Sequence, residues 1–129
     1  MFRYCICIIF LASHLMSEVL ISCKNSMTMY YDLNTMKMDP IKTAIFPITI
    51  QKLDNKFFVE ANAGSSEVIA LASNSETMQF GEYVASGHVV IYTYHANKKI
   101  LVMQKSYTSP TFKTLSNAIT TIWTNCLDY

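Results

Sequence analysis

After Lys24, apolar and polar positions alternate in short segments, and no apolar stripe at helical spacing is sustained over three turns. Residues 43–53 alternate in this way, and residues 57–63 alternate again after the turn residues 54–56. Alternation with a period of two, interrupted by turn residues, is typical of antiparallel hairpins. The two segments are therefore predicted to pair, and Pro47, which has no N–H to donate, marks an edge strand or a bulge.

A second long hairpin is predicted further along the chain. Residues 88–96 and 99–107 are rich in β-branched and aromatic side chains and flank the turn residues 97–98. Residues 118–126 form the expected closing strand, and the pair of threonines in them favours a strand over the alternative, a short helix over 116–123. We expect an all-β fold of about seven or eight antiparallel strands in meander order, forming a small barrel or a sandwich.

The first 22 residues have a different pattern. Arg3 supplies a single positive charge, an apolar run follows from Tyr4 to Met16, and a more polar stretch ends at Ser22. This is the layout of a secretory signal peptide, and the run is too short for a transmembrane helix, which needs about 20 apolar residues. We expect an N-terminal signal helix over residues 1–22 that is cleaved on export, followed by one small β-domain over residues 23–129.

The cysteines allow more than one role. Cys5 and Cys7 fall in the predicted leader, which leaves Cys23 and Cys126 near the two ends of the remaining chain. Two thiols on an exported domain are expected to form a disulfide. In a second interpretation, Leu20-Ile21-Ser22-Cys23 resembles the bacterial lipobox, and Cys23 carries a lipid. The disulfide and the lipid attachment exclude each other, because a thioether sulfur cannot join a disulfide. In a third interpretation, both thiols are free or form intermolecular bonds.

Composition and charge narrow the function classes. With 129 residues and 51% hydrophobic content, the chain suits one compact domain. Its formal net charge is +1, and its one arginine, Arg3, lies in the predicted leader. Nucleic-acid binding normally needs a basic patch, often with arginines that contact phosphate. The cluster Lys98-Lys99 at a hairpin tip does not supply one, so we expect no nucleic-acid partner.

The chain lacks the patterns that indicate catalysis. Beyond the predicted leader, the histidines are His88 and His95, which are seven residues apart and so face opposite sides of one predicted strand. They cannot share a catalytic or metal site within one sheet layer, and no carboxylate or thiol lies at metal-ligand spacing from either. No glycine-rich phosphate loop is present. We therefore expect neither an enzyme nor a metal or cofactor.

Aromatic residues are the most prominent candidate for function. Tyrosine provides contact area and a hydrogen bond at low entropic cost, which makes it common in binding surfaces. Tyr92 and Tyr94 share a predicted strand face with His88, and Phe112 lies in the predicted loop 108–117. Because function often lies on loops held by a rigid scaffold, we predict a binding surface formed by these four residues.

Together these features predict a secreted or periplasmic β-domain that binds a protein partner, such as an inhibitor or an immunity-type factor. Ser86-Gly87-His88 before an apolar strand ending in Tyr92, in a small exported barrel with few cysteines, resembles the periplasmic lysozyme inhibitors in general architecture. The alternative is an envelope lipoprotein or an assembly subunit that pairs through an edge such as the Pro47 strand. Membrane contact is expected only if Cys23 is lipidated.

Overall fold

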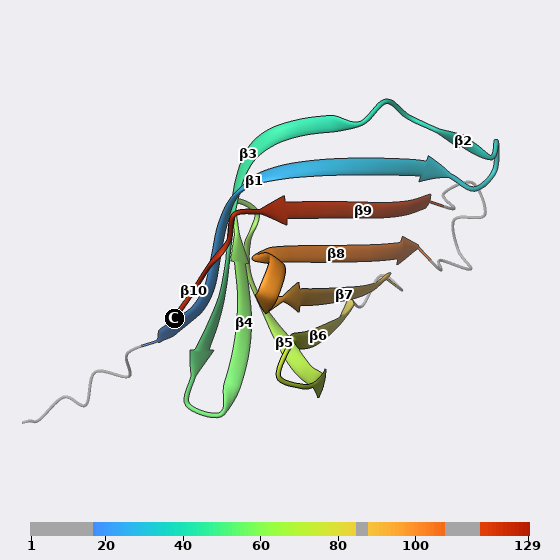
Figure 1. The fold of residues 1–129 in the computed structure, drawn as a ribbon. Coiled ribbons are helices and arrows are strands. Elements are labelled where there is room, and N and C mark those ends of the chain that lie inside the picture. The colour runs from blue at the N-terminus through green and yellow to red at the C-terminus, as the bar shows by residue number, and fades with distance from the viewer. Residues whose placement is uncertain (1–16, 85–87, 108–116) are drawn as a thin grey trace, which may run out of the picture.

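The computed structural model describes residues 17–84, 88–107 and 117–129, and this part of the chain is almost entirely β-structure (Figure 1). The all-β prediction is confirmed. The elements are, in chain order, β1 (Glu18–Asp32), β2 (Lys37–Met38), β3 (Lys42–Leu53), β4 (Lys56–Ala61), β5 (Gly64–Ser73), β6 (Thr77–Val84), β7 (His88–His95), the 3-10 helix η1 (Ala96–Lys98), β8 (Ile100–Tyr107), β9 (Asn117–Thr124) and β10 (Leu127–Asp128).

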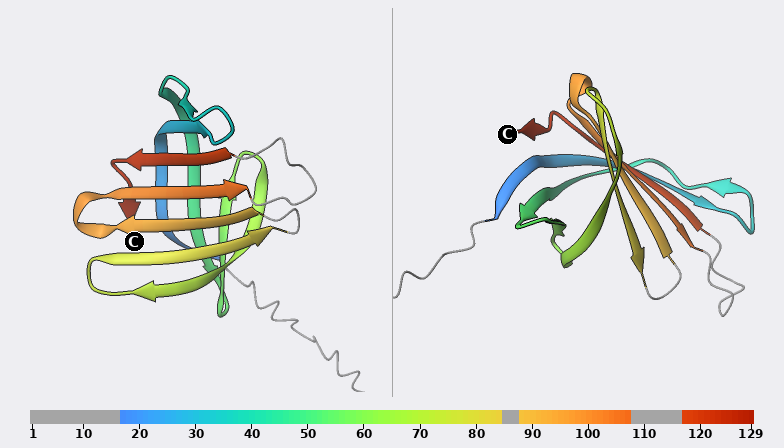
Figure 2. Two further views of the ribbon diagram at one scale, coloured as in Figure 1. Left: turned by 90° about the vertical axis from the view of Figure 1, so that its right-hand side faces the viewer. Right: turned by 90° about the horizontal axis from the view of Figure 1, so that it is seen from below.

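Eight of these strands close into an antiparallel barrel. Strands β1, β3, β4, β5, β6, β7, β8 and β9 are neighbours in that order, and β9 pairs back with β1. The meander order and the closing strand are confirmed, and of the two predicted architectures the barrel is the one observed. The short strands β2 and β10 pair with β1 outside this ring. Figure 2 shows β6–β9 lying across β3 and β4.

Strand β1 contributes to two sides of the barrel. Its first part pairs with β3 and β10, and its second part pairs with β3 and β9. Between the pair Cys23–Ile48 and the pair Asn25–Ile45, β1 advances by two residues (23 to 25) while β3 advances by three (48 to 45). The extra residue lies in β3 at Phe46–Pro47, which is a β-bulge. Of the two features predicted from Pro47, an edge strand or a bulge, the bulge is observed here.

The hydrophobic core fills the barrel interior. Successive side chains of a strand point to opposite faces, so β7 buries Val90, Tyr92 and Tyr94 and places Ile91 and Thr93 on the other face. Trp123 of β9 is also completely buried. The other buried apolar side chains are Ile21, Cys23, Ile48, Ile50, Val59, Val68, Phe80, Leu101 and Cys126.

The helix prediction for the N-terminus needs a correction. Residues 1–16 of the predicted signal segment lie outside the described residues, but Glu18–Ser22 form the beginning of strand β1. These residues include the β-branched Val19 and Ile21, and β3 and β10 pair with this part of β1 on its two sides. A helix there would leave those neighbouring strands without partners, so the prediction is wrong for residues 18–22.

Candidate functional site

An open groove lies where β1, β3 and β9 run side by side. Its volume is about 480 Å³. The groove is lined by residues of these three strands, namely Asn25, Ser26, Met27, Thr43, Ala44, Ile45, Ile122 and Thr124. We call this surface the groove face. The three strands are far apart in the sequence, and their residues meet because β1 pairs with both β3 and β9.

Strand register arranges the groove face in two rows. In the first row, Met27 of β1 lies opposite Thr43 of β3 and opposite Ile122 of β9. In the second row, Asn25 lies opposite Ile45 and Thr124. Side chains directly across neighbouring strands are in contact distance of one another. The result is a small apolar centre bordered by hydroxyl and amide groups.

The apolar centre of the groove face is accessible to solvent. The residue Ile45 is 79% exposed and Met27 is 37% exposed. Large aliphatic side chains are among the residues most often buried, so neighbouring exposed ones that line a groove are a mark of an interaction site. Strand β4 pairs with β3 only from Ile48 onward. Among the described residues, the part of β3 before the bulge therefore pairs with β1 on one edge and has no strand partner on its other edge. Ile45 therefore lies beside an open strand edge.

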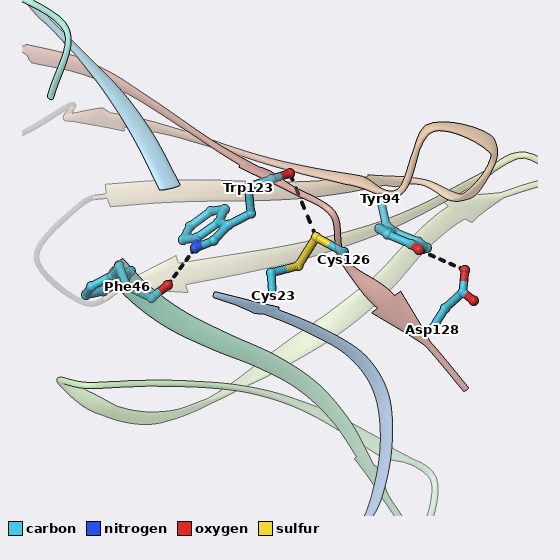
Figure 3. Close-up of a disulfide and its surroundings, with 6 residues drawn as sticks. All are labelled: Cys23, Phe46, Tyr94, Trp123, Cys126 and Asp128. Atoms are coloured by element: carbon cyan, nitrogen blue, oxygen red, sulfur yellow. Dashed lines mark hydrogen bonds between the residues drawn. A yellow bond between two sulfur atoms is a disulfide. The ribbon is translucent and has the colours of Figure 1, made fainter. Parts of the chain in front are cut away.

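The bulge next to the groove face is held by a buried tryptophan. The indole Nε1–H of Trp123 donates a hydrogen bond of 2.7 Å to the backbone carbonyl of Phe46, and the two rings lie 6.1 Å apart (Figure 3). A bulge takes backbone groups out of the regular ladder, and a carbonyl left without a partner near the core would be costly. Trp123 therefore stabilises the bulge in β3 that lies next to Ile45.

The two tyrosines of the predicted aromatic surface, Tyr92 and Tyr94, are buried. Tyr92 is 6% exposed and Tyr94 is 1% exposed, so both rings belong to the core. Their hydroxyl groups donate hydrogen bonds to Glu82 at 3.4 Å and to Asp128 at 2.7 Å, respectively. Burial, followed by the neighbouring Glu82 carboxylate, raises the pKa of Tyr92. Contrary to the prediction, the two rings are not accessible to a partner, because they face the barrel interior and pack in the hydrophobic core.

The other two members of the predicted surface, His88 and Phe112, are not shown to lie near the tyrosines. Phe112 lies outside the described residues. His88 is the first residue of β7 and pairs with Val84 and Tyr107, but its side chain is outside the description. The residues of the groove face were not recognised in the sequence, although Pro47 indicated an irregular or open edge close to Ile45.

The disulfide between Cys23 and Cys126 is present, as predicted (Figure 3). Both half-cystines are buried, and the bond connects β1 to the segment between β9 and β10. The sequence separation of the two residues is 103. Because its sulfur is bonded to Cys126, Cys23 has no free thiol to which a lipid could be attached.

A small polar cluster lies at the C-terminal end of the barrel. One carboxylate oxygen of Asp128 accepts hydrogen bonds of 2.7 Å from the Lys99 ammonium group and from the Tyr94 hydroxyl group. These two contacts, the lysine first, lower the pKa of Asp128. Burial, followed by the bond to Asp128, raises the pKa of Tyr94. The cluster therefore links β10 to β7 through Tyr94, and its ion pair with Lys99 requires an ionised aspartate.

The part of the chain that the structure describes has no metal site formed by clustered ligands. Within residues 17–84, 88–107 and 117–129, no group of three or more His, Cys, Asp or Glu side chains is placed to hold a metal ion. The helical structure described in those ranges is too short to cross a membrane. No family model, curated protein or solved structure matches the chain.

Proposed function

We propose that the protein is a small exported binding domain that holds a protein partner at the groove face and acts without catalysis, as an inhibitor or an immunity-type factor. The observation that carries this proposal is the exposed Ile45 beside Met27 in a groove of about 480 Å³. Protein interfaces commonly have an apolar centre and a polar rim, which is the composition of this surface. Methionine adds a flexible contact that adapts to a partner's shape.

The disulfide supports the export part of the proposal. Disulfides form and persist mainly in secreted, periplasmic and other oxidising environments. The Cys23–Cys126 bond lies in the core, so it is a structural bond rather than an exposed reactive one. The lipoprotein alternative would need the same Cys23 sulfur in a thioether, and the observed bond disfavours it.

Site-specific photo-crosslinking tests the proposed surface. A photoreactive amino acid at position 45, introduced into the full chain in a cell that exports it, is expected to yield a discrete protein adduct. The same group at the exposed Ser65 of β5 is the control and should yield none. A second chain with the photoreactive group at Thr124 and the substitution Ile45→Lys should lose the adduct that Thr124 alone gives. Equal crosslinking at positions 45 and 65, or none at either, would contradict the proposal.

A second candidate function is that of an assembly subunit, and the open edge of β3 favours it. An unpaired edge is a template for strand addition by another chain. Size-exclusion chromatography at two protein concentrations separates the candidates. Assembly predicts an apparent mass that rises with concentration and returns to that of a monomer in Ile45→Lys, because a charged side chain beside an edge opposes pairing. The inhibitor-type function predicts a monomer at both concentrations.

A further inference from the structure

The first strand extends into the segment that the sequence pattern assigns to the leader. Residues Glu18 to Ser22 pair with β3, and Ile21 and Ser22 also pair with Asp128 and Leu127 of β10. The backbone N–H of Tyr129 donates a 3.0 Å hydrogen bond to the carbonyl of Leu20. This part of β1 therefore has a neighbouring strand on each side.

The same residues contribute to the core. The side chain of Ile21 is 1% exposed and belongs to the buried cluster that includes Ile50, its partner on β3. Leu20 packs against this cluster from its margin. A chain that began at Cys23 would lack both side chains, and β10 would lose its strand partner. The barrel thus requires residues that a cut directly before Cys23 would remove.

We propose that the leader is cleaved no later than the bond between Ser17 and Glu18, so that the exported protein retains the whole of β1. Ser17 is an exposed small residue immediately before the strand, and small residues are typical of the exit of a signal peptide. Cleavage there leaves Cys23 inside a strand, with its sulfur in the core and bonded to Cys126. The position of the cut and the fate of Cys23 are therefore linked.

Intact-mass spectrometry of the full chain, expressed in an exporting cell and purified from the exported fraction, tests the proposal. The expected mass is that of a chain beginning at Glu18 or earlier within the leader, lower by about 2 Da before reduction than after it, which is the mass of two hydrogens. A chain beginning between Val19 and Cys23, or a mass raised by acyl chains on Cys23, would overturn the proposed boundary. An uncleaved chain in the exported fraction would overturn it too, whereas absence of the protein from that fraction would overturn the export on which the inference rests, so the two failures are distinguishable.

A pair of substitutions tests the structural requirement independently of the cell. Ile21→Ser is expected to lower the urea midpoint of the exported protein by about 1 M, because it removes a buried aliphatic side chain. The control Glu18→Ser, at an exposed position of the same strand, should leave the midpoint unchanged. Equal midpoints for Ile21→Ser and the unaltered protein would show that the start of β1 is dispensable, and would overturn the inference. If Ile21→Ser does not fold, the mass of the unaltered protein decides.

Discussion

The two buried tyrosines of β7 differ in how well their hydroxyl groups are bonded. The hydroxyl of Tyr94 lies 2.7 Å from its carboxylate acceptor, and that of Tyr92 lies 3.4 Å from its own. We expect Tyr94→Phe to lower the free energy of unfolding by about 1 kcal/mol, and Tyr92→Phe, the matched control, to lower it by less than half as much. Urea unfolding followed by the fluorescence of the completely buried Trp123 measures both. Equal losses of unfolding free energy in the two variants would show that the hydrogen bond from Tyr94 to Asp128 is no stronger than the one from Tyr92 to Glu82.

The carboxylate that accepts from Tyr94 also predicts a pH dependence. The pKa of Asp128 is lowered in the folded state, so its ionised form stabilises the fold at pH values above its unfolded pKa of about 4. This contribution is lost as the pH falls through the lower folded pKa. The stability difference between the unaltered protein and Asp128→Asn should therefore be constant near neutral pH and shrink in acid. Ser65→Ala, an exposed substitution in β5 that removes no ionisable group, is the control and should show no such trend.

Some residue roles could be predicted because a single chemical property decides them. The disulfide followed from the position of Cys23 and Cys126 outside the predicted leader, and the bulge followed from the missing N–H of Pro47. The burial of Tyr92 and Tyr94 did not follow. In a central strand both faces are apolar or aromatic, so alternation separates two sets of side chains without showing which set faces the core.

At the scale of elements, the β4–β5 hairpin depends on the conformation of one glycine. Gly64 follows the two-residue turn and has φ +125°, a conformation that side-chain-bearing residues rarely adopt. Gly81 of β6 has no such φ, and a Cβ there would lie 3.1 Å from the terminal Cδ1 of Leu71, a half-exposed side chain that can move. The two glycines therefore serve different purposes.

We expect Gly64→Ala to destabilise the protein by roughly 1–3 kcal/mol, because the new Cβ makes the backbone conformation strained. Gly81→Ala should change stability by less than about 0.5 kcal/mol, since the gain from a stiffer unfolded chain offsets the shift of Leu71. Thermal unfolding of both variants under one set of conditions makes the comparison. A loss at Gly81 as large as that at Gly64 would mean that contact with Leu71, and not backbone conformation, determines tolerance.

The strands themselves were largely predictable, and the groove face was not, for a reason that belongs to the arrangement of elements. Each hairpin is formed by neighbouring segments whose turns and alternation are visible in the sequence. The groove face combines Met27, Ile45 and Ile122, which meet because β1 pairs with β3 on one edge and with β9 on the other. Neither a local pattern nor a turn residue specifies those pairings.

At the scale of the whole molecule, the barrel closes where the first and last strands of the described residues meet. Strands β9 and β10 both pair with β1. The disulfide joins β1 to the segment between β9 and β10, at this closure (Figure 3). A bond between residues 103 apart restricts the unfolded chain strongly, by roughly 4–5 kcal/mol in the loop-closure model.

The double substitution Cys23→Ala and Cys126→Ala should therefore lower the free energy of unfolding by about 2–4 kcal/mol, less than the loop-closure value because measured gains usually fall short of it. Urea unfolding with and without a thiol reductant provides an internal control. The reductant should destabilise the unaltered protein towards the stability of the double variant and leave the variant itself unchanged. If the reductant has no effect on the unaltered protein although mass spectrometry shows that the bond is reduced, barrel closure rests on strand pairing and core packing alone. If the reductant instead lowers the free energy of unfolding by several kcal/mol, the covalent link between β1 and the segment after β9 is the main support of the closure that forms the groove face.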